Sequence, residues 1–473
     1  MAYNLLEESW IPVLYRDGRR DHVSTCKALE DASEIRQVAA SNPMDRVAVV
    51  RFLLAVLYWC KGNPQVDMVA SSNAPFPAVW FSKLDQNKDC FDLLGHGRRF
   101  YQHRKEGDRL LSAAYLVQEV PTGTNWWHFR HATQGLHGLC PACCALGLLR
   151  LPLFATSGGR GKPPGVNGRP PVYALPVADS LAGTLRLSWQ WVRKIGTPAW
   201  EKPDLNLPDA GEVPLLTGLT WLPRRVWLSD PQPQKADCIS CGRRESTILR
   251  SVFGSIGSTR TDPDGPGRVW ADPHVLYSVD TKGQVTALRP GNALGAGDAA
   301  AGQWTRTIAG ILKARGQGET ARVWVVSFST VRNDKYVEAT ERFVEVPDSR
   351  EEAEASLERV ERWHKESSGL AGRLKRQVEQ GTSRKHVEIP AAIVTVRPHV
   401  ESKVSSNVGE LLAGGDEAWG EAAREYSTMM DIIARSLSPG FTASAIERRQ
   451  AIASVVPNMG PRTKPTKKRG GDK

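Results

Sequence analysis

The sequence predicts an α+β protein with two folded domains, a large mixed N-terminal domain and a C-terminal four-helix bundle. A chain of 473 residues is too long for a single hydrophobic core, so two domains are the expected minimum. Up to about residue 345, short alternating apolar segments are mixed with helical ones and with many turns. After Pro347 the apolar residues keep helical spacing, and the change of pattern predicts a domain boundary there.

The N-terminal domain, residues 1–347, is predicted to contain both helices and strands. Met44 to Trp59 is the clearest helix. Its apolar run from Val47 to Cys60 is interrupted by Arg51 and is shorter than the roughly 18 residues that a membrane span needs, so a buried helix is expected. Gly297 to Ala314 is a second candidate helix. Strands are predicted around Leu185–Trp191, Val226–Leu228, Val275–Val279 and Val323–Phe328.

Residues 348–457 are predicted to form the C-terminal bundle. Asp348 and Glu351 fit a capping box at the start of a helix, and apolar residues at helical spacing follow them. The other segments expected in the bundle are Ala418 to Leu437, Thr442 to Val455, and a short apolar stretch around residues 389–396 that contains a proline.

The formal net charge of +11 is unevenly distributed along the chain. Residues 458–473 are predicted to be a basic disordered tail, because Gly460 to Lys473 combines prolines and glycines with six basic residues and one acidic residue. A solubilising tail and a nucleic-acid-binding arm fit this composition equally well. The N-terminal stretch has two glutamates and no basic n-region, so a cytoplasmic location without membrane contact is expected.

Five of the eight cysteines form two clusters. Cys140 and Cys143 form one Cys-x-x-Cys pair, with Cys144 directly after it, and Cys238 and Cys241 form the other pair, which a glycine follows. Each pair places two thiolates on one tight turn, and two such turns supply the four corners of a tetrahedral Zn²⁺ site. Because 94 residues separate the pairs, the ion would join two distant segments of the N-terminal domain.

Other interpretations of the cysteines remain open. The two pairs could be unrelated to each other, or one of them could be a redox Cys-x-x-Cys. A redox motif would need only one pair, in a thioredoxin-like context that the sequence lacks. Four thiolates leave no open position for water, so the predicted zinc is structural and not catalytic. Cys144 is expected to be a bystander, although it could replace Cys143 as ligand. The isolated Cys26, Cys60 and Cys90 are expected to be small buried hydrophobic residues.

Two further segments have the composition of nucleic-acid-binding loops. The first runs from Thr156 to Pro171 and combines several glycines with basic residues, so its backbone can approach phosphates or enter a groove. It is not a Walker A loop, because Lys162 is followed by proline. The second runs from Asn125 to His131 and mixes aromatic residues with His and Arg, which suits stacking on unpaired bases. A flexible surface loop and a buried aromatic core are the alternatives for the two segments.

Four features in chain order carry a family resemblance. They are the opening stretch from Asn4 to Val13, the Phe100-Tyr-Gln102 element with Arg99 in a position where proline is usual, the two cysteine turns with the glycine segment, and Trp270-Ala-Asp-Pro-His274. In this order and spacing they resemble the large subunit of the type I-E CRISPR Cascade complex, the CasA family. The resemblance covers about 340 residues, and the C-terminal bundle agrees with it in class.

The resemblance implies that the glycine segment reads the protospacer-adjacent motif (PAM) of double-stranded DNA from the minor groove. A lysine after the second cysteine turn also reads the PAM in the family, and Arg260 is the nearest basic residue here. A wedge on a β-hairpin splits the duplex beside the PAM. The PAM-contact candidates are Gly158, Gly159, Arg160, Gly161 and Arg260, with Asp334, Lys335 and Tyr336 as the wedge, where the family often has glutamine.

The segment before Cys140 resembles the part of the family that docks on the guide RNA. Its RNA-contact candidates are Asn125, Trp126, Trp127, Phe129 and Arg130. The resemblance therefore implies a non-catalytic subunit whose partners are the guide RNA, the other Cascade subunits and target DNA. It leaves open whether this chain recruits a separate helicase-nuclease.

Two other functions are alternatives. A zinc-containing RNA-binding scaffold unrelated to CRISPR would also combine a four-cysteine site with an aromatic, basic loop. A metal-dependent nuclease would need a catalytic constellation, and the sequence has neither a His-Glu-x-x-His motif nor a nucleophile elbow. His128, His131 and His137 could in principle ligate a metal with Cys140. Nuclease activity of the purified chain would distinguish this function from the non-catalytic one.

Overall fold

The fold is described from a computed structural model of the chain. The chain divides into two compact units, Met1–Ala293 with Arg306–Val344, and Leu294–Thr305 with Glu345–Lys473. Almost every described residue belongs to the first unit. The predicted C-terminal bundle, the basic tail and the helix expected at 297–314 all lie outside the described residues. The structure describes residues 3–64, 73–117, 138–154, 171–205, 211–256, 268–269, 272–275, 277–279, 285–287, 322–331 and 336–345.

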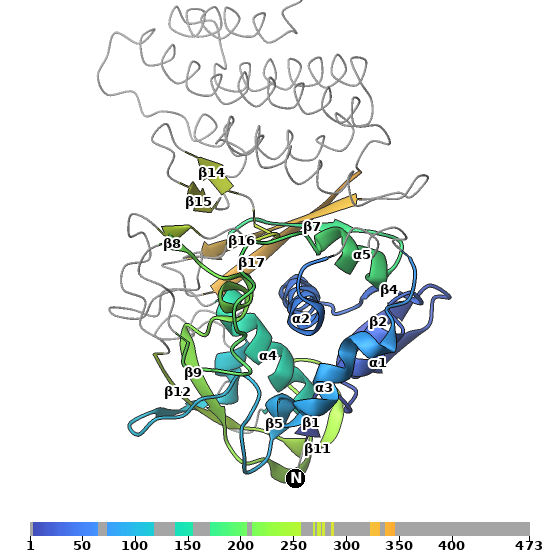
Figure 1. The fold of residues 1–473 in the computed structure, drawn as a ribbon. Coiled ribbons are helices and arrows are strands. Elements are labelled where there is room, and N and C mark those ends of the chain that lie inside the picture. The colour runs from blue at the N-terminus through green and yellow to red at the C-terminus, as the bar shows by residue number, and fades with distance from the viewer. Residues whose placement is uncertain are drawn as a thin grey trace, which may run out of the picture. The chain divides into compact units, whose positions relative to one another are not determined.

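One long helix, α2 (Pro43–Lys61), lies at the centre of the first unit (Figure 1). The Asn42 side chain caps it by accepting the Met44 N–H at 2.8 Å, and Gly62 ends it with a positive φ of 77°. Its residues are buried almost all round, because α4 (Pro141–Phe154), α5 (Leu181–Ser188) and α6 (Leu215–Thr220) pack against it. The helix predicted over Met44 to Trp59 is confirmed. No described helix is long and apolar enough to span a bilayer.

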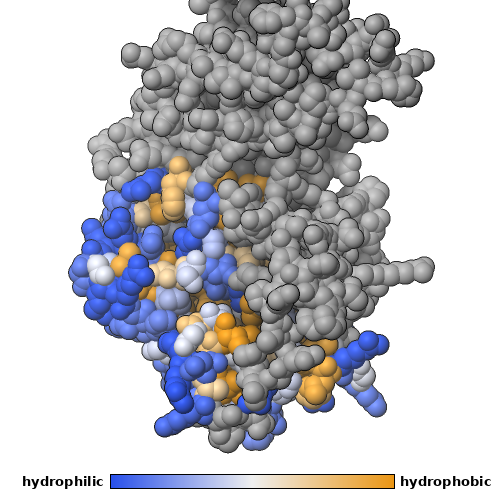
Figure 2. Space-filling view, turned by 180° about the vertical axis from the view of Figure 1, so that it is seen from behind, coloured by the Kyte–Doolittle hydropathy of each residue, from blue (hydrophilic) through white to orange (hydrophobic). Residues whose placement is uncertain are grey.

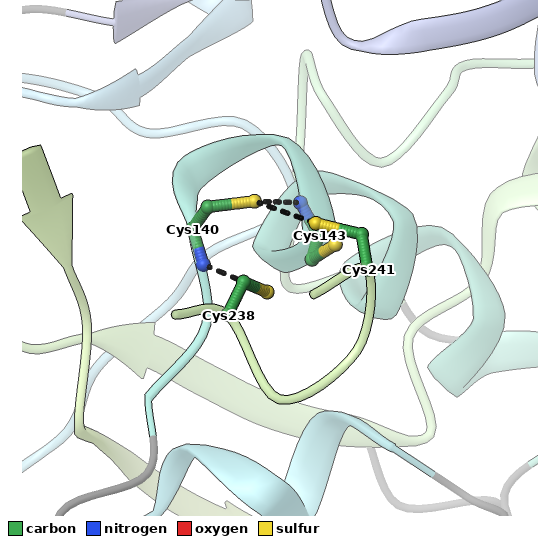
Figure 3. A group of neighbouring side chains, drawn as sticks. All are labelled: Cys140, Cys143, Cys238 and Cys241. Atoms are coloured by element: carbon green, nitrogen blue, oxygen red, sulfur yellow. Dashed lines mark hydrogen bonds between the residues drawn. The ribbon is translucent and has the colours of Figure 1, made fainter. Parts of the chain in front are cut away.

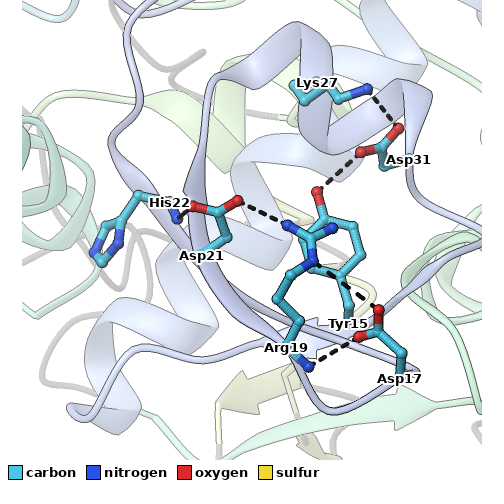
Figure 4. Close-up of polar contacts among 7 residues, drawn as sticks. All are labelled: Tyr15, Asp17, Arg19, Asp21, His22, Lys27 and Asp31. Atoms are coloured by element: carbon cyan, nitrogen blue, oxygen red, sulfur yellow. Dashed lines mark hydrogen bonds and ion pairs between the residues drawn. The ribbon is translucent and has the colours of Figure 1, made fainter.

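A small antiparallel sheet follows the N-terminus, in the order β3-β2-β4, with β2 at Ile11–Tyr15, β3 at Arg20–Val23 and β4 at Ile35–Val38. Side chains tie this sheet to helix α1 (Thr25–Glu30) and to the residues after it (Figure 4). The Tyr15 hydroxyl donates to Asp31 at 2.9 Å, and Lys27 binds the same carboxylate. The Arg19 guanidinium lies 3.7 Å from the centre of the Tyr15 ring and pairs with Asp21.

Three further groups of strands surround the helices. The order β6-β12-β9 joins Arg109–Ser112, Ser251–Ile256 and Arg224–Leu228, all antiparallel, and the hairpin β10–β11 joins Gln232–Asp237 to Arg244–Ile248. The order β17-β16-β7 joins Tyr336–Glu345, Arg322–Val331 and Tyr173–Val177. The strands predicted at Val226–Leu228 and Val323–Phe328 are therefore confirmed.

The remaining elements are short. The predicted strand at Val275–Val279 is confirmed in part, as an isolated bridge at Val275 and strand β14 at Tyr277–Val279. The others are β1 (Tyr3–Asn4), β5 (Asp92–Leu94), β8 (Gly211–Glu212), β13 (Arg268–Val269), β15 (Val285–Ala287), α3 (Ser82–Gln86), and the 3₁₀ turns Ala78–Phe81, Lys88–Phe91 and Ala113–Leu116.

The strand predicted around Leu185–Trp191 is wrong, because helix α5 occupies Leu181–Ser188. The Ser180 side chain caps this helix by accepting the Gly183 N–H at 3.1 Å. All eight residues of the helix are buried, so the apolar alternation that resembled a strand lies on a helix enclosed on every side. Residues 189–198 belong to neither a helix nor a strand.

A buried ion pair joins α2 to the Trp-x-x-Pro-His segment. Both nitrogens of the Arg51 fork lie 2.6 Å from the Asp272 carboxylate, and the two side chains are 3% and 0% exposed. Asp272 also accepts the backbone N–H of His274, which is fully buried. Neither ring nitrogen of His274 has a hydrogen-bond partner in the described part of the chain. The described part of this motif, with Asp272 and His274, therefore belongs to the core.

We expect His274 to make the protein less stable in mild acid. Burial, and after it the charge of Arg51, lower the pKa of His274 to about 3. Unfolding restores a pKa near 6.5, so the unfolded chain binds an extra proton between about pH 6.5 and 3, and stability falls as the pH falls through that window. At pH 5 this group should reduce the free energy of unfolding by about 2 kcal/mol relative to pH 7.5. Urea titrations at both pH values should show that difference between the wild type and His274→Phe, and an equal pH dependence of the two proteins would contradict it.

Candidate metal centre and nucleic-acid interface

Four cysteine side chains lie close together in the fold (Figure 3). The Sγ atoms of Cys140, Cys143, Cys238 and Cys241 all lie within 4.8 Å of one another, and those of Cys140 and Cys241 are 3.9 Å apart. Sulfurs at the corners of a tetrahedron around Zn²⁺ would lie about 3.8 Å apart, because a Zn–S bond is about 2.3 Å. The two pairs, distant in sequence, thus approach the spacing that one ion requires.

The first pair belongs to the start of a helix and not to an isolated tight turn as expected. Cys140 directly precedes α4, and its backbone oxygen accepts the first helical hydrogen bond from Cys144 at 3.0 Å. Its sulfur accepts the Cys143 N–H at 3.5 Å, in the manner of a helix cap. Hydrogen bonding to Cys143 lowers the pKa of the Cys140 thiol, but hydrogen bonding to Cys238 and burial raise it to about 12. A metal ion bound here would therefore displace the proton of Cys140.

The second pair occupies the turn between strands β10 and β11. The Cys238 N–H donates to the Arg243 oxygen at 2.9 Å, and the Gly242 N–H donates to the Cys238 oxygen at 2.8 Å. Gly242 has a φ of 70°, which side-chain-bearing residues rarely adopt, and no atom lies within 4 Å of where its Cβ would be. The glycine after Cys241 is therefore needed for the turn itself.

Backbone pairing holds the two cysteine turns together. Leu139 and Leu249 exchange two hydrogen bonds of 2.8 and 2.9 Å, and the Ile239 N–H donates to Gly138 at 3.1 Å. The Cys140 N–H donates to the Cys238 sulfur at 3.3 Å, which directly links the pairs. A Cβ on Gly138 would lie 2.1 Å from a side-chain carbon of Ile248, so only glycine permits this approach.

The electrostatics of the centre suit a cation. Hydrogen bonds with Cys140 and Cys238, together with burial, raise the pKa of the Cys143 thiol, while hydrogen bonds from Cys140 and Cys143 lower the pKa of Cys238. These hydrogen bonds favour the thiolate form of Cys238. A bound divalent ion would replace the protons of the Cys140 and Cys143 thiols. Four sulfur donors without an oxygen suit zinc, and they leave no position for a reacting water.

Cys144 has a different environment from its neighbour. It is fully buried in α4, and burial raises its pKa well above the ordinary value. Its sulfur is not in the four-cysteine group, so the geometry favours Cys143 as the ligand. Cys90 is buried as expected, whereas Cys26 and Cys60 are half-buried at the edge of the core.

The candidate nucleic-acid residues fall outside the described residues, except for the backbone of Tyr336, which begins β17. In sequence, the RNA-contact segment ends at His131, seven residues before Gly138, and the glycine segment lies between the end of α4 and the start of β7. The wedge residues connect β16 to β17. Outside the description are Asn125, Trp126, Trp127, Phe129, Arg130, Gly158, Gly159, Arg160, Gly161, Arg260, Asp334 and Lys335.

The Phe100-Tyr-Gln102 element is part of the core. The Gln102 amide donates to the Leu93 oxygen at 2.8 Å and accepts the Leu228 N–H at 2.9 Å. Phe100 is fully buried against Phe91, with ring centres 5.8 Å apart. This motif, like the Arg51–Asp272 pair, is buried in the core and presents no exposed side chain.

Fold and site together define a class: a mixed α/β protein in which a four-cysteine centre joins two distant segments. Residues 4–452 match the family model described as CRISPR-associated protein Cse1. This chain belongs to that family, and the resemblance to CasA proteins is confirmed.

Individual relatives agree with this assignment. A CRISPR-associated protein CasA/Cse1 from Thermus thermophilus is 29% identical over 307 residues, which are 61% of this chain and 57% of that protein. The alignment thus spans just over half of the relative.

Solved structures share the fold. The crystal structure of Thermus thermophilus CasA matches with a TM-score of 0.69 at 18% identity, covering 97% of this chain and all of that one. Thermobifida fusca Cse1 matches with a TM-score of 0.68 at 16% identity, covering 97% of each chain. A chain of a CRISPR RNA-guided surveillance complex matches with a TM-score of 0.66 at 14% identity, covering 96% of this chain and 99% of that one.

Proposed function

We propose that this protein is the non-catalytic large subunit of a type I-E Cascade surveillance complex. In this function it recognises the PAM in double-stranded DNA, wedges the duplex open beside it, and so starts pairing between guide RNA and target. The observation that carries the proposal is the four-cysteine centre of a Cse1-family chain. In sequence, the RNA-contact segment ends nine residues before Cys140, and the glycine segment follows the helix that begins at this centre.

The metal's role in this proposal is structural. Zinc, when bound, cross-links the start of α4 to the turn between β10 and β11. The chain's own residues then do the rest: the Leu139–Leu249 pairing aligns the two segments, and buried α4 holds the start of the glycine segment. A rigid base reduces the entropy that a loop loses on binding DNA.

The division of labour follows from the chemistry of the grooves. Guide pairing supplies sequence discrimination, while the protein reads a short duplex motif; the same logic holds for a different effector type. Minor-groove readout distinguishes little more than A·T from G·C, so the glycine segment would recognise its motif loosely. Recruitment of an effector helicase-nuclease would be a further task of the same subunit.

The wedge offers the direct test of this function. We expect Lys335→Ala combined with Tyr336→Ala to slow target opening at least about tenfold, because removing the bulky groups leaves the cost of unstacking a base step, a few kcal/mol, uncompensated. Target opening is measured by the permanganate reactivity or the 2-aminopurine fluorescence of a target duplex. The PAM of this duplex is identified beforehand by selecting the sequences that the wild-type complex binds from a library with a randomised flank.

Assembly must be measured in parallel. The double variant should still join the complex around the guide RNA, and Lys27→Ala, which removes an exposed lysine paired with Asp31, should behave as the wild type. Unchanged target opening in the double variant would refute the wedge. Failure of the wild-type chain to assemble with guide RNA would refute the proposed function, and metal-dependent DNA cleavage by the chain alone would refute its non-catalytic part.

A further inference from the structure

The irregular stretch after helix α5 presents one tryptophan to solvent. Trp191 is 70% exposed, whereas Trp189, two residues before it, is 2% exposed. The other exposed large apolar residues among those described are aliphatic or a phenylalanine: Val79, Leu110, Ile239 and Phe343. Single exposed apolar residues need no special explanation, so the case for Trp191 depends on how it is held and on its neighbours.

The backbone on both sides of Trp191 is held firmly. The Trp189 indole N–H donates to the Gly62 oxygen at 2.8 Å, and the Tyr58 hydroxyl accepts the Gln190 N–H at 2.8 Å and donates to its oxygen. Asn63 exchanges two hydrogen bonds with Val192, at 2.8 and 2.9 Å. These contacts with the end of α2 leave the exposed indole on a fixed support.

The support continues on the far side. Lys194 and Ile195 accept backbone N–H bonds from Leu215 and Leu216, at 2.9 and 2.7 Å. Val192 and Ile195 turn inwards and pack against the core. The side chains left facing solvent are Gln190, Trp191, Arg193 and Lys194.

The stretch that carries the exposed indole has basic residues and no acidic one. Ser180 to Trp200 contains no acidic residue, and Arg193 and Lys194 are both exposed. No carboxylate forms an ion pair with either of them within the described ranges. Lys61, next to Gly62, lies 5.1 Å from the Trp80 ring, whose centre is 5.8 Å from that of the buried Trp189 ring.

We propose that Trp191, Arg193 and Lys194 form a binding site for single-stranded RNA, in which an unpaired base stacks on the indole and the two cations contact its phosphates. A π face beside cations, without a groove, is the arrangement that single strands use and that duplexes, with their bases already stacked, do not. The inference rests on the proposed function, in which RNA is the permanent polynucleotide partner. A protein partner would be expected to match a broader apolar patch than a single exposed indole. On the face that Figure 2 draws, both hydrophilic and apolar residues reach the described surface.

The test uses the purified full chain and a fluorescent ten-nucleotide oligouridylate in an anisotropy titration. Trp191→Ala should weaken binding about fivefold to a hundredfold, the effect of losing one stacked base, and Trp191→Phe should retain most of the affinity. Arg193→Ala with Lys194→Ala should reduce the slope of log affinity against log salt by about 1.4, for two phosphates of a single strand. Leu110→Ala, which removes another exposed side chain, is the matched control.

Each other outcome contradicts the inference. If Trp191→Ala bound RNA with wild-type affinity, Trp191 would not be a stacking site. If the substitution weakened only the binding of oligodeoxyuridylate, the site would be assigned to single-stranded DNA. A variant that binds RNA normally but no longer joins the other subunits would assign the surface to a protein partner. Because Trp191 is exposed, its replacement should leave the melting temperature unchanged. If any of these outcomes contradicted the RNA site while the wild-type complex still assembled, the proposed function would be unaffected.

Discussion

Replacing Cys238 and Cys241 by serine is expected to abolish metal binding and to lower the free energy of unfolding by more than about 4 kcal/mol. The physical reason is the position of the site: an ion there joins the start of α4 to the β10–β11 turn across 94 residues of chain. Without it, the buried thiols retain their protons, and only backbone hydrogen bonds connect the segments. Plasma mass spectrometry of the purified protein measures the metal, and urea denaturation measures the stability.

The adjacent cysteines provide a matched control on one helix. Cys143→Ala should lose the metal, whereas Cys144→Ala should keep one ion per chain and lose only about 1 kcal/mol for the small cavity. If Cys144→Ala lost the metal and Cys143→Ala kept it, Cys144 would be the ligand in place of Cys143. Full metal content in the Cys238/Cys241 variant would show that the four cysteines do not share an ion.

Replacing Asp272 by alanine should destabilise the protein by about 3–5 kcal/mol. Arg51 is 3% exposed, and the substitution leaves its charge buried without the carboxylate that it now contacts at 2.6 Å through two nitrogens. The backbone N–H of His274 loses its acceptor as well. Urea denaturation followed by circular dichroism measures the loss.

Two comparisons separate the buried charge from a general effect of the substitution. Arg51→Met with Asp272→Leu should recover much of the stability, because it removes both charges and keeps apolar volume. Asp21→Ala breaks an ion pair with Arg19 whose side chains are about half exposed, and should cost less than about 1 kcal/mol. An Asp272→Ala protein as stable as the Asp21→Ala protein would contradict the role of the buried pair.

The centre of the fold and its candidate metal site could be predicted from local patterns. The apolar run of α2 is long enough to indicate a buried helix, and two Cys-x-x-Cys pairs indicate a shared ion by the number of ligands they supply. The order of the motifs was sufficient to indicate the family. The domain boundaries, the basic tail and the DNA and RNA contacts remain predictions.

Other features could not be predicted because they depend on burial on all sides. The alternation around Leu185 indicates a strand only if one face of the segment is exposed. Helix α5 is enclosed on all sides, so a strand and a helix would bury the same residues. The hydrogen bond from the Gly183 N–H to the Ser180 side chain caps the segment as a helix. Trp189 and Trp191 are likewise indistinguishable in sequence, yet one lies in the core and the other in solvent.

The amino-acid sequence alone determined which residues could serve as ligands, where the long helix lies and to which family the motifs point, because these depend on residue type and short spacing. The tertiary structure alone decided that Cys143 and not Cys144 faces the other thiols, that Arg51 meets Asp272, and that Gly138 permits the two turns to approach. These facts are contacts between segments about 100 or more residues apart, and no local pattern specifies which side chains such contacts bring together.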